Sequence, residues 1–245
     1  MMMSHEGYPK TVGDFYTKEK LDEILRELGK VFRKLNGTKI PAEIVLVEGA
    51  AVIASFGFRE STSDIDALIQ ASSSMKDAIH QMADQYGLSW DWMNQDFKKT
   101  SSYSDKIVQY SVPYRTFSNI LHVRTLPAEY VAAMKLASLR EYKYDKSDVI
   151  GIIRETGITR NAVEQAVSNL YGGFAELRRA QLAEKLLDEI YSSDDLELLY
   201  RKYREEEQES FALLKELDQD PDYALTRDNV NDVIAAVKRK MRSLT

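Results

Sequence analysis

Two aspartates, Asp64 and Asp66, have the types and spacing to do chemistry. The residues around them, Ile65 to Ile69, predict a strand, and side chains alternate between the two faces of a strand. Both carboxylates therefore point to the same face, about 7 Å apart at the backbone for a rise of ~3.3 Å per residue. Half-buried like charges are costly unless a ligand neutralises them. The pair indicates a site for one hard cation, and the alternative is an edge strand with two solvated carboxylates.

Features upstream of the pair favour a phosphate-bearing ligand. Gly49-Ala50 follows a short apolar run, at a point where a helix could begin, and phosphates bind at such turns. Between this turn and the aspartates lies a polar loop that begins with Arg59. Hydroxyl groups in the loop could reach phosphate oxygens, and they belong to Ser61, Thr62 and Ser63. Together these features predict a site for a metal–nucleotide complex.

Lys135 lies on a mostly apolar face of a predicted helix that begins at Pro127. Its helical neighbours include Val131 and Leu139. It is either a lysine whose stem covers core residues or a cation aimed into a cleft near phosphate or the acidic pair. This helix alone does not decide between the two.

Two further aspartates follow that helix at helical spacing. Asp145 precedes an apolar run and suits the start of a helix, so we interpret it as a cap. Asp148 lies one turn inside the helix and could pair with Lys135 or Arg140.

Asp91 is a candidate third carboxylate. It lies between Trp90 and Trp92 in a predicted strand, so it faces away from both tryptophans. It is either a polar residue on an exposed strand face or a partner of Asp64 and Asp66 on a neighbouring strand.

Composition limits the classes of protein to consider. The 245 residues allow one large domain or two small ones, and 44% hydrophobic residues can form a real core. The absence of cysteine excludes thiolate chemistry and fits a reducing cytoplasm, and we expect neither a membrane span nor a signal peptide. A net charge of −6 argues against a broad surface that coats nucleic acid but permits a local basic patch. The basic run 201–204 is followed by three glutamates, so we expect a salt-bridged face there.

Periodicity predicts an α/β half followed by a helical half, with a boundary near residue 126. Helices are expected over 14–36, 49–57 and 72–86, and strands over 44–47, 64–70, 88–93, 107–111 and 120–124. Beyond the boundary the predicted helices cover 127–143, 146–155, 160–171, 176–191, 195–217 and 227–242. The expected domains are thus 1–126, and a helical region 127–245 that contributes Lys135 and Asp148 to the cleft.

These motifs, in this order, resemble the nucleotidyltransferase superfamily that includes DNA polymerase beta, and more narrowly the bacterial toxin nucleotidyltransferases of abortive-infection systems. The superfamily pattern matches Gly49-Ala50 and Asp64-Ile65-Asp66, and active members usually carry serine at the position of Ala50. The related toxins add a second motif, matched here by Lys135, Ala137, Arg140 and Asp148. The resemblance covers roughly residues 40–155. It implies an α/β (α+β) nucleotidyltransferase-like fold, with a small mixed sheet flanked by helices and an all-helical C-terminal region.

The resemblance also implies an activity, the transfer of a nucleoside monophosphate from an NTP to an acceptor hydroxyl. Mg²⁺ (or Mn²⁺) would be held by Asp64 and Asp66, with Asp91 completing the metal site or deprotonating the acceptor. Lys135 would offset triphosphate charge and Asp148 would orient it. The nucleotide-binding residues would be Gly49, Ala50, Arg59, Ser61, Thr62, Ser63 and Arg140.

The acceptor could be a tRNA end, a protein or a small molecule, and the sequence does not choose among them. A cognate antitoxin and an oligomer are further expectations, with a cytoplasmic location. The alternative function is a catalytically degenerate module that senses nucleotides or binds a protein partner.

Overall fold

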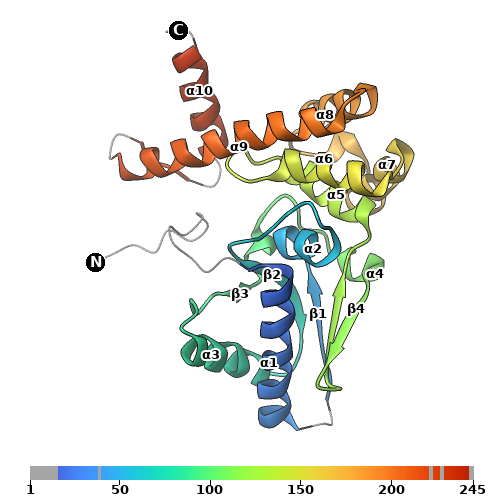
Figure 1. Ribbon diagram of the computed structural model, residues 1–245, viewed down its shortest axis with the longest axis vertical. Helices are drawn as coiled ribbons and strands as arrows, with labels where there is room; N and C mark the ends of the chain where they lie inside the picture. The colour runs from blue at the N-terminus through green and yellow to red at the C-terminus, as the bar shows by residue number, and fades with distance from the viewer. Residues whose placement is uncertain (1–15, 38–39, 221–222, 227–228, 243–245) are drawn as a thin grey trace.

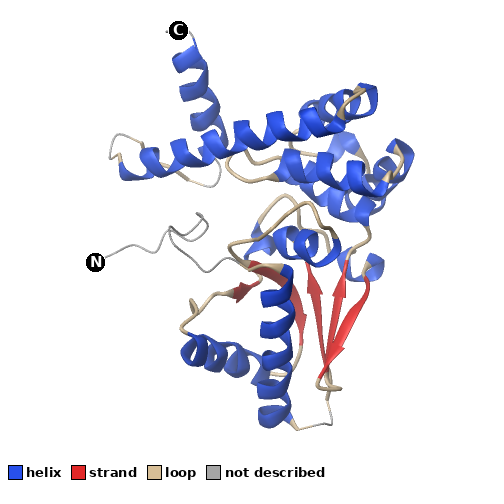
Figure 2. Cartoon of the chain, in the orientation of Figure 1, coloured by secondary structure: helices blue, strands red, loops and turns tan. Residues whose placement is uncertain are grey.

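A mixed sheet and a helical C-terminal region make up the fold in the computed structural model, which describes residues 16–37, 40–220, 223–226 and 229–242 (Figures 1 and 2). The strands are β1 (Ala42–Leu46), β2 (Ile65–Gln70), β3 (Met93–Asn94), β4 (Val112–Phe117) and β5 (Leu121–Thr125). They form a five-stranded sheet in the order β3-β2-β1-β5-β4. β1 runs parallel to β5 and antiparallel to β2, while β3 is parallel to β2 and β4 is antiparallel to β5. The expected α/β class and mixed sheet are confirmed.

The two faces of the sheet serve different cores. Alternate residues of β1, Ile44 and Leu46, pack with helices α1 (Lys18–Asn36) and α3 (Ser74–Tyr86). Val45, between them, faces the opposite side and packs with the helices after residue 126. This second core therefore crosses the boundary expected near 126. By the same alternation Asp64 and Asp66 share a face with Leu68, which packs in that second core.

The helix caps explain where the N-terminal elements begin and end. The side chain of Thr17 accepts a hydrogen bond from the amide of Lys20, so α1 begins at Lys18. The expected residues 14–15 of that helix lie outside the described residues. Gly37 and Gly87 have φ of 71° and 65° after α1 and α3, a conformation in which glycine has no steric penalty.

Two strand predictions in this half were wrong. The segment predicted as strand 107–111 is instead the short helix α4 (Ile107–Tyr110), and the edge strand β4 follows it. β4 was not predicted because its residues are largely exposed. They lack the alternation of hydrophobic and polar residues that is typical of a half-buried strand. In the segment 88–93 only Met93 is in a strand. The amide of Trp92 donates to the carbonyl of Ser89 in a turn, and its indole donates to the carbonyl of Ile79.

The C-terminal region is helical. Its helices are α5 (Ala128–Ser138), α6 (Asp145–Thr156), α7 (Arg160–Tyr171), α8 (Ala180–Ser192), α9 (Leu196–Gln219) and α10 (Val230–Arg242). The helix predicted over 127–143 ends earlier, because Leu139 adopts a left-handed conformation with φ 38°. Residues 227–228 of the last predicted helix lie outside the described residues. Among the described helices, none has the length and apolar character that a membrane span requires.

α9 lies across α6 and extends away from the sheet (Figure 1). Its far end packs Leu214 and Leu217 against Val230 and Ile234 of α10 and against Tyr142. The loop before α6 is therefore held by the C-terminal helices.

Candidate active site

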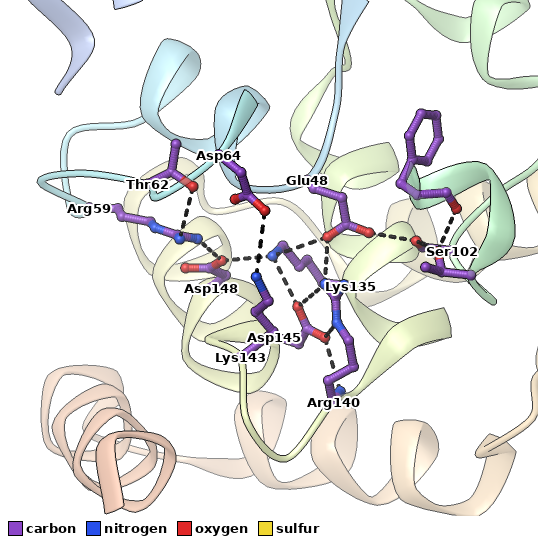
Figure 3. A network of polar contacts seen from close by, with 12 residues as sticks. Glu48, Arg59, Thr62, Asp64, Ser102, Lys135, Arg140, Lys143, Asp145 and Asp148 are labelled. Atoms are coloured by element: carbon purple, nitrogen blue, oxygen red, sulfur yellow. Dashed lines mark hydrogen bonds and ion pairs between the residues drawn. The ribbon is translucent and has the colours of Figure 1, made fainter. Parts of the chain in front are cut away.

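A buried lysine is the centre of a charge network on the face of the sheet that packs against the C-terminal helices. Lys135 is 2% exposed, and its Nζ lies 3.0 Å from Asp145 Oδ1, 3.0 Å from Asp148 Oδ2 and 3.4 Å from Glu48 Oε2 (Figure 3). Burial lowers the pKa of the lysine, but the three carboxylates outweigh this effect and hold the pKa above the ordinary value. Lys135 is therefore a buried ion-pairing group, which is neither the stem-covering lysine nor the cleft-facing cation that the sequence left open.

Arg140 closes the network from the other side. Its guanidinium makes two hydrogen bonds to Asp145, of 2.8 and 2.9 Å, and one of 2.7 Å to Glu48. Its backbone amide also donates to Asp145, across 2.9 Å. Asp145 is not the cap that we expected, because Tyr144 occupies that position and Asp145 is the first residue of α6. Its carboxylate binds the two cations, which hold its pKa well below the ordinary range despite burial.

Glu48 is a member of the site that the sequence analysis did not identify. It begins helix α2 (Glu48–Ser55), is 3% exposed and has φ 51°, which is uncommon for a residue other than glycine. Its carboxylate accepts hydrogen bonds from Arg140 and Ser102. A glutamate inside an apolar run and a lysine on an apolar face were the available signal, since each buried charge requires a partner.

The polar loop 59–63 lies over the start of α2. Arg59 donates to Asp148 Oδ2 across 2.6 Å and to the carbonyl of Ser61 across 3.0 Å. Its second guanidinium nitrogen lies 3.5 Å from Thr62 Oγ1. A β-carbon at Gly49 would lie 2.3 Å from that Thr62 oxygen, so the close approach of loop and helix requires glycine.

Ala50 contributes to the site only through its backbone. Its side chain is fully buried and packs in the apolar cluster that includes Ile53 and Leu46. The methyl group thus points into the core, and the amide is in the first turn of α2, where N–H groups have no acceptor within the helix.

Asp64 has a cationic partner, Lys143, which the sequence analysis did not identify as a site residue. Lys143 Nζ lies 3.7 Å from Asp64 Oδ2, and Ser63 Oγ donates to Asp64 Oδ1 across 3.4 Å (Figure 3). Burial opposes ionisation of Asp64, but Lys143 and Arg59 outweigh it and lower the pKa of this carboxyl.

Asp66 differs from the other carboxylates of the site in the contacts of its side chain. Within the described residues no hydrogen bond or ion pair reaches its side chain, whereas the other charged groups around it are paired. Burial, Asp64 and Glu48 raise the pKa of Asp66 to about 7. Its backbone carbonyl accepts from the amide of Val47, the cap of α2, so this carboxylate lies beside the first turn of that helix.

Asp91 does not join this group. It is exposed, lies in the turn before β3 and accepts a hydrogen bond from Ser89. The register of β3 on β2 places Asn94, not Asp91, opposite Asp66. In the described part of the chain, no three acidic or histidine side chains come together as a metal-binding group. The expectation of a third carboxylate at Asp91 is corrected, because the strand that would have carried it begins two residues later.

The structure thus brings together most of the residues that the sequence singled out. The predicted residues in or next to the charge network are Gly49, Arg59, Ser61, Thr62, Ser63, Asp64, Asp66, Lys135, Arg140 and Asp148. Carboxylates that share a face with cations at a helix N-terminus are suited to bind a cation–phosphate complex.

Comparison with known proteins agrees with this arrangement. No curated protein and no solved structure matches the chain. A family model described as "Nucleotidyltransferase of unknown function (DUF6036)" matches residues 20–183. The match covers more than half of the chain and includes the sheet, the acidic pair and the buried charge network. The chain belongs to this family of nucleotidyltransferases.

Proposed function

We propose that the protein uses a divalent cation to transfer a nucleoside monophosphate from an NTP to an acceptor hydroxyl, with release of pyrophosphate. The observation that carries the proposal is the carboxylate of Asp66, which has no ion-pair partner among the described residues. Three cations, Arg59, Lys135 and Arg140, balance the three buried carboxylates of the network, and Lys143 balances Asp64. One half-buried negative charge is left, and a bound cation would neutralise it.

The residues present fit Mg²⁺ or Mn²⁺. Asp64 and Asp66 supply oxygen ligands on one face of β2. Mg²⁺ is commonly bound through one or two carboxylates together with substrate phosphates, so two aspartates suffice when the nucleotide completes the shell. When bound, the cation would neutralise phosphate charge and align the reacting oxygens.

The groups around the pair would bind the triphosphate. Lys143 reaches Asp64 from the loop before α6 and is only partly buried, so it can turn to a phosphate oxygen. The first-turn amides of α2 and the hydroxyl of Ser63 lie beside the acidic pair. In this proposal Lys143 offsets the triphosphate charge that we first expected Lys135 to meet, while Lys135 holds Glu48, Asp145 and Asp148 in place.

A nucleotide-sensing or partner-binding module is the second candidate. Complete pairing of Lys135 inside the protein favours it, since this lysine is not available to a substrate. The acceptor, a cognate antitoxin, an oligomeric state and membership of the polymerase beta superfamily stay predictions.

Incubation with labelled NTPs separates the two candidates. The full chain is mixed with Mg²⁺ and each α-labelled NTP in the presence of total RNA or total protein, and transferred label is measured. We expect transfer by the wild type and by Asp84→Asn, which alters an exposed aspartate of α3, but not by Asp64→Asn or Asp66→Asn. Tight Mg–NTP binding without transfer to any acceptor would favour the sensing module. Absence of NTP binding would contradict both the transferase and the sensing module and leave a partner-binding module.

A further inference from the structure

Arg204 makes no ion pair within the part of the chain that the structure describes. In the basic run at the start of α9, Arg201 pairs with Glu197 at 2.7 Å and Lys202 pairs with Glu189 at 3.1 Å. Arg204 has no carboxylate partner among the described residues, and its Nη1 atom is buried without a hydrogen bond. The salt-bridged face expected of this run therefore holds for two of its cations and not for Arg204.

Arg204 is instead stacked on Tyr144. Its guanidinium carbon lies 3.4 Å from the centre of the Tyr144 ring, and that of Arg59 lies 5.5 Å from the same centre. Tyr144 separates Lys143, which pairs with Asp64, from Asp145, which pairs with Lys135. Arg204 and Arg59, which pairs with Asp148, therefore lie near the same ring, that of Tyr144.

An unpaired and partly buried guanidinium is suited to an anion brought by a ligand. Its planar set of N–H donors matches phosphate. Arginine planes and aromatic rings side by side are also the groups on which single-stranded nucleic acids dock.

The position of Arg204 favours a role in binding the acceptor rather than the triphosphate. The family match ends at residue 183, before α9, and already includes Asp64, Asp66, Arg59 and Lys143. Arg204 is added by a helix outside that shared segment. A group that serves the acceptor of this particular protein can lie there, whereas the nucleotide site is complete without it.

We propose that Arg204 and Tyr144 form a phosphate-binding subsite that takes a backbone phosphate of a single-stranded nucleic-acid acceptor. The inference rests on the proposed function, because the subsite would deliver the acceptor to the cation held by Asp64 and Asp66.

Binding of a fluorescent single-stranded RNA of about ten nucleotides, measured by anisotropy on the full chain, tests the subsite. Arg204→Gln should weaken binding roughly tenfold, the loss expected for a charge-assisted hydrogen bond. Arg204→Lys should recover only part of it, because lysine lacks the planar fork. Arg201→Gln, which alters an exposed arginine of the same helix, should bind as the wild type does. The slope of log affinity against log salt should fall by about 0.7 in Arg204→Gln, as for one phosphate contact on a single strand.

Calorimetry with Mg²⁺ and a non-hydrolysable NTP distinguishes failure of the subsite from failure of the proposed function. We expect Arg204→Gln to bind this nucleotide as tightly as the wild type. A loss of NTP affinity in Arg204→Gln would overturn the proposal by assigning Arg204 to the triphosphate. Unchanged RNA binding in Arg204→Gln, or no RNA binding by a wild type that binds Mg–NTP, would also overturn it and leave the nucleotide site intact. Melting temperatures of the variants exclude a loss of fold as the cause.

Discussion

Lys135 donates a hydrogen bond to Asp145 across 3.0 Å, with both side chains almost completely buried. The two residues belong to successive helices, and the left-handed turn at Leu139 brings them together. Because the same ammonium also meets Asp148 and Glu48, it ties α5 and α6 to the start of α2.

Replacement of this lysine should be severely destabilising. Lys135→Met leaves buried carboxylates without their central cation, which typically costs about 3–5 kcal/mol when one partner of a buried ion pair is removed. Urea unfolding of the wild type and variant measures the loss. Lys76→Met, at an exposed position of α3, is the control, and an equally small effect of both changes would contradict a structural role for Lys135.

The contact between α2 and the loop 59–63 predicts a second effect. Gly49→Ala places a β-carbon 2.3 Å from Thr62 Oγ1, so loop and helix must separate at a cost of about 1–3 kcal/mol. Gly57→Ala is a matched control, since its β-carbon would meet nothing nearer than Glu155 at 3.8 Å. The double variant Gly49→Ala/Thr62→Ala should regain part of the lost melting temperature. No recovery would show that the clash is not the cause.

Glu207 predicts a dependence of stability on pH. It lies on α9, is 2% exposed, and accepts hydrogen bonds from the amides of Lys146 and Ser147 at the start of α6. Burial, with repulsion from Asp148 and Asp145, raises the pKa of its carboxyl from about 4.5 to about 8. The folded state holds this proton more tightly than the unfolded chain does, so the stabilisation is complete below pH 4.5 and is lost as the pH rises through 8.

Glu207→Gln keeps an acceptor oxygen and cannot ionise. Its melting temperature should exceed that of the wild type above pH 8, and the difference should shrink toward pH 5. Glu205→Gln, at an exposed position of α9, should show no such trend. Parallel curves for the wild type and Glu207→Gln would contradict the raised pKa.

Asp66 should link pH, stability and metal binding. Its pKa is raised from 3.8 to about 7, so the free energy of unfolding of the metal-free wild type should fall as the pH rises between these values. The free energy of unfolding of Asp66→Asn should fall less over the same range. Mg²⁺ binds the ionised form and should therefore raise the melting temperature of the wild type more at pH 8 than at pH 6. Thermal melts with Mg²⁺ or EDTA measure both effects. An equal Mg²⁺ effect on the wild type and Asp66→Asn would show that the ion binds elsewhere.

The sequence predicted the parts of the fold that have a clear period. The amphipathic pattern of α1 and the glycines after α1 and α3 located these helices to within a few residues. Exposed β4 has no such pattern, and the turn at Trp92 depends on a hydrogen bond to Ile79, a contact made across the chain. The helix or strand propensity of a segment cannot predict a hydrogen bond to a residue outside that segment.

The site was predictable where its residues share one element, and less so where they meet in space. Asp64 and Asp66 follow from strand alternation alone. Glu48 and Lys143 become site residues only when α2 and the loop before α6 are brought together. Glu48 in its apolar run signals a buried charge but not its partner, and Lys143 looks ordinary in its own segment. Asp91 was misplaced because its position depended on the register of a strand of two residues.

Calorimetric titration of each NTP in Mg²⁺ or EDTA tests whether Asp64 and Asp66 hold a divalent cation together with a nucleotide. We expect the wild type and Asp84→Asn to bind an NTP only with Mg²⁺. Asp64→Asn and Asp66→Asn should lose roughly 100-fold or more in affinity, since even residues that only support a metal ligand cost 10–100-fold. Equal Mg²⁺-dependent binding by the wild type and both variants would show that Asp64 and Asp66 do not hold the cation.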